Sequence, residues 1–169
     1  MRGIFRKVLV SPPKYNRIVA ETWAAMSQTD PHTTPAGSLP SAPSILVVDD
    51  EPAFCDVVCE VLQMFGFDVR HALSARVALK LLATQKPDLI MTDLMMPGID
   101  GLHLLRRLRA TPAWSHIPTI AVSALGSPEE QSAAKQAGAD AYLAKPFSVD
   151  QLRMTINQFL SASQAKPDS

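Results

Sequence analysis

The chain has 169 residues and a mass of 18.3 kDa, which suffices for one domain of ordinary size and a further segment but not for two full domains. Hydrophobic residues make up 47% and charged residues 19%, a composition typical of a packed globular protein. Sixteen basic residues balance sixteen acidic ones, so net charge offers no argument for a nucleic-acid partner. Apolar windows are too short for a membrane helix or a signal peptide, which predicts no membrane insertion and a cytoplasmic location.

The first 43 residues differ in composition from the rest. Six of the fourteen prolines lie there, and residues 27–44 are almost wholly small or polar. Residues 1–44 hold five basic and two acidic residues, whereas residues 45–165 hold ten basic and thirteen acidic ones. We predict a basic, Pro/Ser/Thr-rich, disordered extension over 1–43 and a short tail over 164–169. Within the extension, residues 15–26 could form a short helix, and Met26 is an alternative start.

From residue 45 onward, short apolar runs alternate with longer segments of helical periodicity. The predicted strands are 45–49, 67–71, 88–92, 119–123 and 141–144, and the predicted helices are 52–65, 75–84, 101–110, 128–137 and 149–160. Capping boxes beginning at Ser127 and Ser148 support two helix starts, and Gly66 and Gly138 are placed as left-handed C-caps. Five strand–helix units predict a parallel sheet covered by helices on both faces.

Two cysteines, Cys55 and Cys59, lie four residues apart in the predicted helix 52–65. Helical spacing separates their Cβ atoms by ~5 to 6 Å, beyond the distance that a disulfide requires. We therefore expect reduced thiols that contribute to packing. A zinc site is not expected from two thiols with no His or further Cys nearby in the sequence.

Charged and polar residues follow the predicted strands at their carboxyl ends, where open α/β sheets bind ligands. Asp49 and Asp50 close the first strand and Asp93 the third, and Ser123 and Lys145 end or follow the fourth and fifth. Two carboxylates ~5 Å apart repel by about 3 kcal/mol at an effective dielectric of ~20. The cluster therefore needs positive charge, which Lys145 and a hard divalent cation such as Mg²⁺ would supply.

These motifs resemble the receiver family of response regulators. The matches, in chain order, are the pair Asp49-Asp50, the segment DLMMPGIDG from Asp93, VSA at 122–124 and AYLAKPF at 141–147. The resemblance covers residues 44–163. It implies the flavodoxin-like α/β fold, a three-layer (βα)5 sandwich with a parallel five-stranded sheet in the order 2-1-3-4-5.

The resemblance also implies a phosphoacceptor and a metal site. Asp93 would take a phosphoryl group from the phosphohistidine of a sensor histidine kinase or a histidine phosphotransfer protein, forming an aspartyl phosphate. Mg²⁺ (or Mn²⁺) would be the cofactor. Its implied ligands are Asp49, Asp50, Asp93 and the backbone carbonyl of Met95.

Further roles are implied around the phosphoryl group. Ser123 and Lys145 would bind its oxygens, and Ser123 together with Tyr142 would form the switch that responds to it. The Lys145–Pro146 peptide bond would be cis. The chemistry would be limited to intrinsic gain and loss of one phosphoryl group, so an enzyme is not expected.

The nine residues after the last predicted helix are too few for an output domain, so we expect a receiver that signals by altered protein binding. In the family, the face used lies over the helices 128–137 and 149–160 and the strand 141–144. Three alternative functions fit parts of the pattern. A phosphatase of the haloacid dehalogenase type needs a second acid where Met95 stands, and a flavin phosphate would be repelled by Asp49 and Asp50. A phosphorylation-independent adaptor on the same fold stays open.

Overall fold

The computed structural model describes residues 42–163, with residues 161–163 described by their backbone only. The predicted helix over 15–26, the alternative start at Met26 and the tail over 164–169 lie outside the described residues. The extension that the sequence predicts to be disordered also lies outside them, apart from residues 42 and 43.

Five parallel strands form one sheet in the order β2-β1-β3-β4-β5, which confirms the predicted flavodoxin-like topology. The strands are β1 Ser44–Val48, β2 Asp68–Ala72, β3 Leu89–Asp93, β4 Thr119–Ser123 and β5 Ala141–Ala144. The helices are α2 Pro52–Met64, α3 Ala75–Thr84, α4 Gly101–Ala110, α5 Pro128–Ala137 and α6 Val149–Ser163. No helix within residues 42–163 is long and apolar enough to cross a membrane.

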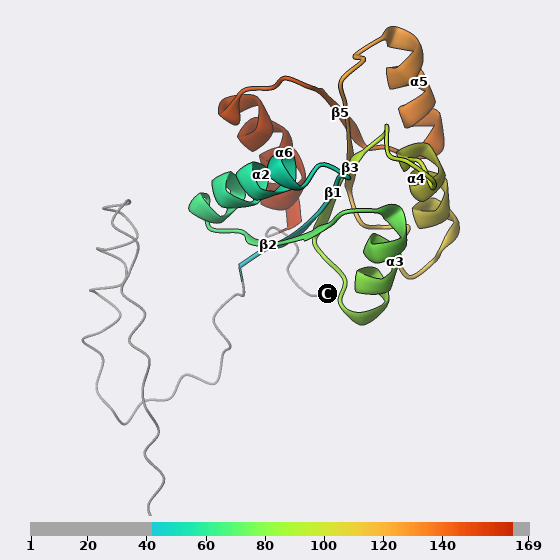
Figure 1. Cartoon of the computed structure of the whole chain (residues 1–169). Coiled ribbons are helices and arrows are strands. Elements are labelled where there is room, and N and C mark those ends of the chain that lie inside the picture. The colour runs from blue at the N-terminus through green and yellow to red at the C-terminus, as the bar shows by residue number, and fades with distance from the viewer. Residues whose placement is uncertain (1–41, 164–169) are drawn as a thin grey trace, which may run out of the picture. The chain divides into compact units, whose positions relative to one another are not determined.

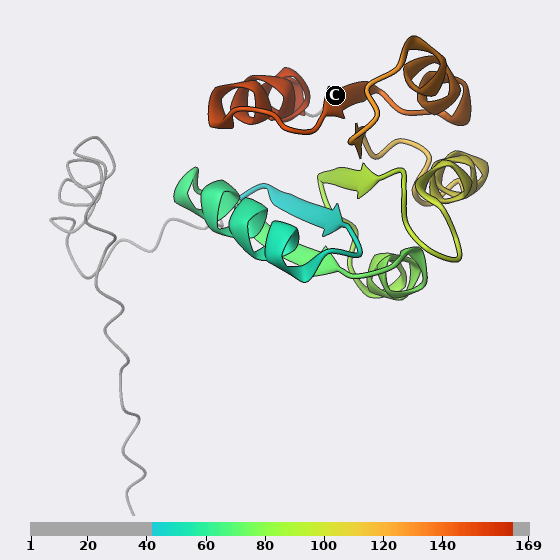
Figure 2. The same ribbon diagram turned by 45° about the horizontal axis from the view of Figure 1, so that its top comes forward.

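Helices cover both faces of the sheet. In Figure 1, α2 and α6 lie on one face, and α3, α4 and α5 lie on the other. The turned view of Figure 2 shows the strands between these two helical layers. The fold is therefore the three-layer sandwich that the alternation of strands and helices predicts.

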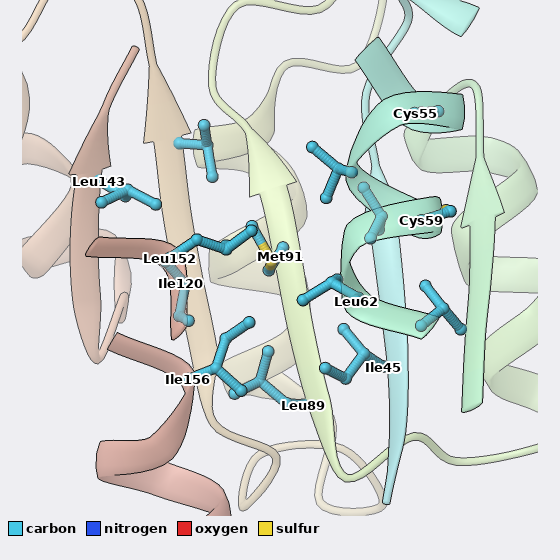
Figure 3. Packing of buried hydrophobic residues seen from close by; sticks show 14 of the residues in the cluster. Ile45, Cys55, Cys59, Leu62, Leu89, Met91, Ile120, Leu143, Leu152 and Ile156 are labelled. Carbon is cyan, nitrogen blue, oxygen red and sulfur yellow. The ribbon is translucent and has the colours of Figure 1, made fainter. Parts of the chain in front are cut away.

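Alternate strand residues supply the cores on the two faces. Ile45 packs in the cluster under α2 and α6, whereas the next residue, Leu46, packs under α3 and α4. Figure 3 shows Leu62 of α2 and Ile156 of α6 in the first cluster, together with Ile45 and Leu89 of the sheet. Because β1 and β3 are buried on both faces, their sequences are nearly continuous apolar runs.

Cys55 and Cys59 are unpaired and buried on the inner side of α2, as predicted. Burial, followed by the charge of Asp49, raises the pKa of the Cys55 thiol to about 11. Burial also raises the pKa of Cys59, whose Sγ lies 4.0 Å from Nδ1 of His71, a neighbour that the sequence spacing did not indicate. Thiols with raised pKa values stay protonated at neutral pH and pack as small apolar groups.

β2 begins one residue later than the predicted range 67–71. Gly66 adopts a φ of +89° after the end of α2, and the amide of Phe67 donates to the carbonyl of Leu62 at 3.2 Å. This amide completes the C-terminal cap of the helix and is not available to the sheet. Pairing with β1 therefore starts at Asp68.

β1 and β3 are each shifted by one residue, in opposite directions, from the predicted ranges 45–49 and 88–92. The Asp88 carboxylate accepts from the backbone nitrogen of Ser44 at 2.7 Å and from its Oγ at 2.8 Å. Asp88 thus anchors the start of β1, and β3 begins at Leu89. At its other end β3 includes Asp93, which is in register with Val122 of β4. The central strand ladder therefore positions the Asp93 backbone directly.

Gly101 allows α4 to begin against the end of β3. A Cβ atom at this position would overlap the carbonyl oxygen of Asp93 and approach Cα of Leu94 to 2.7 Å. The preceding Asp100 caps the helix, because its carboxylate accepts from the amide of His103 at 2.7 Å. The Asp-Gly pair thus determines where the loop after Asp93 ends.

The guanidinium of Arg109 links chain segments at the amino end of the sheet. Nε of Arg109 donates to the carbonyl of Gly138 at 2.8 Å, and Nη2 pairs with Oδ2 of Asp140 at 2.6 Å. Nη1 donates to the carbonyls of Ser115 at 3.0 Å and Ile117 at 2.9 Å. A single side chain of α4 therefore satisfies backbone acceptors before β4 and after α5.

We expect Arg109→Lys to lower the free energy of unfolding by about 2 kcal/mol, because an ammonium cannot span the same carbonyls and leaves some of them unpaired. Arg107→Lys, on the exposed side of the same helix turn, is the matched control and should change it by less than ~0.5 kcal/mol. Urea unfolding measures both. Equal losses in the two variants would contradict the role assigned to Arg109.

Candidate functional site

The carboxyl edge of the sheet brings together four of the residues singled out from the sequence. Asp49 follows β1, Asp93 ends β3, Ser123 ends β4 and Lys145 follows β5. Asp49 is 2% exposed, Asp93 6% and Ser123 0%. Asp50, the second residue of the acidic pair, is exposed instead. The edge therefore holds two buried carboxylates and a third at its surface.

Lys145 contacts both buried carboxylates. Its Nζ lies 2.6 Å from Oδ2 of Asp49 and 3.3 Å from Oδ1 of Asp93. The same nitrogen lies 3.8 Å from the centroid of the Phe54 ring, which adds a cation–π contact from α2. The Lys145–Pro146 peptide bond is cis. One ammonium thus serves two carboxylates and is held by an aromatic ring.

Phe54 was not singled out from the sequence as a site residue. It is partly buried, and Phe147 packs edge-on against it, with ring centroids 6.0 Å apart and an interplanar angle of 84°. An aromatic residue in the first turn of an apolar helix reads as an ordinary core position. No sequence motif predicts that the ring of Phe54 contacts the ammonium of Lys145.

The pKa values of Asp93 and Lys145 are both shifted, but for different reasons. Burial raises the pKa of Asp93, the charge of Lys145 opposes this rise, and the charge of Asp49 adds to it. Burial lowers the pKa of Lys145, but the hydrogen bond that its ammonium donates to Asp49 and the charge of Asp93 outweigh burial, so the lysine pKa is raised. Lys145 remains charged, while Asp93 is only partly compensated. Further positive charge at Asp93 would therefore be favourable.

Backbone amides orient both carboxylates. The amide of Met95 donates to Oδ2 of Asp93 at 2.9 Å, and the amide of Glu51 donates to Oδ1 of Asp49 at 2.9 Å. Each amide lies two residues after the acid that it contacts, in the loop that follows the strand. The loops thereby help to fix the orientation of the two acids.

The donor set suits magnesium better than zinc or another soft metal. No group of three or more His, Cys, Asp or Glu side chains between residues 42 and 163 is arranged to hold a metal ion. Mg²⁺ characteristically takes only one or two carboxylates and completes its octahedron with waters and other oxygens. Asp50 and Asp93 offer such carboxylates, and Met95 adds a backbone carbonyl in the adjoining loop.

The hydroxyls of Ser123 and Tyr142, the predicted switch pair, both donate to the carboxylate of Glu130. The sequence placed Glu130 only in the capping box that begins at Ser127. Oγ of Ser123 donates to Oε1 of Glu130 at 2.8 Å, and the hydroxyl of Tyr142 donates to Oε2 at 2.6 Å. The amide of Gly126 donates to the same tyrosine oxygen at 3.2 Å. Burial, followed by the hydrogen bond to Glu130, raises the pKa of Tyr142.

The capping box predicted at Ser127 forms only in part. Oγ of Ser127 accepts from the amide of Glu130 at 3.1 Å, as a cap should. The Glu130 carboxylate contacts the two hydroxyls instead of returning to the Ser127 amide, because buried Ser123 has a stronger need of an acceptor than a solvated helix start. The second box is reciprocal, with Ser148 and Gln151 bonded at 2.8 and 3.1 Å.

The sheet order and the composition of its carboxyl edge define a class of protein: a receiver domain of two-component signalling. The model of the response regulator receiver domain matches residues 45–157. The chain belongs to this family.

Similar proteins agree with this assignment. The DNA-binding dual master transcriptional regulator RpaA of Synechocystis is 36% identical over 127 residues, which cover 75% of this chain and 53% of that protein. The receiver domain of a signal transduction histidine kinase from Syntrophus aciditrophicus is 30% identical with a TM-score of 0.69, covering 76% of this chain and 97% of that one. The chain spans about half the length of the curated relatives it matches.

A third similar structure bears on the metal. The receiver domain of a sensor histidine kinase from Pseudomonas aeruginosa is 28% identical with a TM-score of 0.66, and the match covers 71% of this chain and 98% of that one. That domain is described with a magnesium ion coordinated in its active-site cleft. Receiver domains as a family bind Mg²⁺ at this site and take phosphoryl groups from histidine kinases.

We expect Lys145→Met to lower the free energy of unfolding by about 3 kcal/mol at neutral pH, because it leaves Asp49 and Asp93 buried without a cation. The loss should shrink on acidification. An acid with a raised pKa is protonated more readily in the folded than in the unfolded protein, so falling pH favours the folded state.

Lys135→Met, an exposed lysine of α5, is the matched control and should have little effect. Urea unfolding at several pH values measures the difference. A loss for Lys145→Met no larger than for the control would show that Lys145 does not compensate the buried acids.

Proposed function

We propose that this receiver domain is a phosphorylation-dependent switch in which Asp93 is the phosphoacceptor. The donor would be the phosphohistidine of a sensor histidine kinase or a phosphotransfer protein. The observation that supports this most strongly is the environment of Asp93: a nearly buried carboxylate at the end of the central strand, with its compensating lysine shared with Asp49. Such a carboxylate is positioned, ionisable and incompletely neutralised.

The proposed transfer is a displacement at phosphorus. One carboxylate oxygen of Asp93 forms a bond to phosphorus while the bond to the donor's histidine nitrogen breaks, and the electron pair of that bond stays on the nitrogen. Lys145, with its ammonium 3.3 Å from Asp93, would pair with a phosphoryl oxygen. Ser123 would donate its hydroxyl to another. Bound Mg²⁺ would neutralise charge on the carboxylates and phosphoryl oxygens.

The residues proposed to hold the metal lie at the carboxyl edge of the sheet. Asp50, Asp93 and the backbone carbonyl of Met95 would bind it directly, and Asp49 would bind it through a water molecule. Mn²⁺ has similar ligand preferences and would substitute. The chemistry of the domain itself would end with gain and loss of the phosphoryl group, so we do not propose an enzyme with a separate substrate.

The response would pass to a protein partner through α5, β5 and α6. A surface pocket of about 500 Å³ is lined by Tyr142 of β5 and by Pro128, Gln131 and Lys135 of α5, among others. A change in the position of Tyr142 would alter this surface and thereby the affinity for a partner. The absence of a nucleic-acid partner stays a prediction, since RpaA is a DNA-binding regulator.

We expect the protein to take up one phosphoryl group from acetyl phosphate in the presence of Mg²⁺, and Asp93→Asn to abolish the uptake. Intact-mass spectrometry measures the adduct. Asp56→Asn, an exposed aspartate of α2, is the matched control and should be labelled like the wild type. Labelling of Asp93→Asn at the wild-type level would overturn the assignment of the phosphoacceptor.

Mg²⁺ should raise the melting temperature, because it binds the folded site and relieves the crowding of the acids. Asp50→Asn should remove most of this increase and should itself stabilise the metal-free protein, because it removes one of the crowded negative charges. Calorimetry with and without Mg²⁺ measures both effects. A wild-type melting temperature that does not respond to Mg²⁺, or an undiminished response in Asp50→Asn, would contradict the proposed metal site.

A further inference from the structure

Glu130 accepts hydrogen bonds from both hydroxyls of the proposed switch. Oε1 receives Oγ of Ser123 at 2.8 Å, and Oε2 receives the hydroxyl of Tyr142 at 2.6 Å. We propose that Glu130 is a latch: a positioning residue that holds the Ser123 hydroxyl away from Asp93 and so weakens the affinity of the site for a phosphoryl group. The inference rests on the proposed function of Asp93.

The latch works by competition for a single proton. A serine has one O–H to donate, and that of Ser123 is directed to Glu130. Asp93 is in register with Val122 on the neighbouring strand, so the next residue, Ser123, lies at the same edge of the sheet. A phosphoryl oxygen on Asp93 can use the Ser123 hydroxyl only if the bond to Glu130 breaks.

The cost of that exchange is set by the surroundings. Ser123 is 0% exposed, so water cannot replace either partner freely. Hydrogen bonds to a carboxylate are stronger than those between neutral groups. Removing the carboxylate would therefore raise the free energy of the unphosphorylated state and leave Ser123 available to the phosphoryl group.

Glu130 also connects the site to the surface. Tyr142 borders the pocket next to α5 and donates to the second oxygen of the same carboxylate. Because the two oxygens belong to one rigid group, departure of Ser123 from Oε1 frees the carboxylate to rotate and changes what Tyr142 can bond. A phosphoryl group on Asp93 would in this way change the surface that a partner contacts.

The helix start holds the latch in place and supplies its control. Ser127 caps α5 by accepting from the amide of Glu130 at 3.1 Å, which fixes the backbone of this residue independently of its carboxylate. The adjacent Glu129 has the same charge in the same helical turn but is exposed. Glu129→Ala therefore reproduces the loss of charge at the helix start without loss of the latch.

The test is the affinity for beryllofluoride in the presence of Mg²⁺, followed by the ¹⁹F NMR signal of the bound species. Beryllofluoride bonds to a carboxylate and has the tetrahedral shape of a phosphoryl group. We expect Glu130→Ala to lower the half-saturating concentration about tenfold, the factor that corresponds to one charged hydrogen bond. Glu130→Gln retains one acceptor oxygen and should give a smaller decrease, and Glu129→Ala should bind like the wild type.

Repeating the titration in a Ser123→Ala background separates the latch from simple charge repulsion. Without the hydroxyl there is nothing to release, so Glu130→Ala should change the affinity less than twofold. An equal gain in both backgrounds, or no gain in either Glu130 variant with Ser123 present, would overturn the latch. If the wild type bound no beryllofluoride, the proposed function of Asp93 would be overturned. That result differs from normal beryllofluoride binding that is insensitive to Glu130, which would overturn only the latch.

Discussion

Lys145 reaches Asp49 at 2.6 Å and Asp93 at 3.3 Å, and the chemistry proposed for this edge depends on that shared contact. Two buried carboxylates would be costly to ionise without a cation. A single ammonium offsets part of this cost and does so unequally, because it lies closer to Asp49. Asp93 keeps a raised pKa. The site is therefore prepared to gain from additional positive charge and from a phosphoryl group that recruits the lysine.

The fold supplies the precision that this contact requires. Asp93 belongs to the ladder of the central strand, and Gly101 lets the following helix press against its carbonyl. From the same edge, hydrogen bonds lead outward through Ser123 and Glu130 to Tyr142. In the proposed switch, a change in charge at the buried acid would be linked to a change in shape at the surface by these two hydrogen bonds to one carboxylate.

Much of this arrangement could be predicted from the sequence, because apolar runs locate strand ends and parallel strands bring those ends to one edge. Strand boundaries were wrong by one residue where a backbone amide bonds outside the strand ladder, as that of Ser44 does with Asp88 and that of Phe67 does with Leu62. The partners of Glu130 and Phe54 could not be predicted. Glu130 fits a capping box by its spacing, yet its carboxylate turns to two hydroxyls on other elements. Such choices depend on burial and on side-chain directions in three dimensions, which spacing does not encode.

A crystal structure of the protein with Mg²⁺ and beryllofluoride tests the central claim most directly. We expect the fluoride group on Asp93, with Nζ of Lys145 and Oγ of Ser123 on two of its fluorine atoms and the metal between Asp50 and Asp93. We also expect Glu130 to have lost its contact with Ser123. Beryllofluoride bound away from Asp93 would contradict the proposed phosphoacceptor. Beryllofluoride on Asp93 with Lys145 in contact with Asp49 alone would contradict the role of the shared lysine.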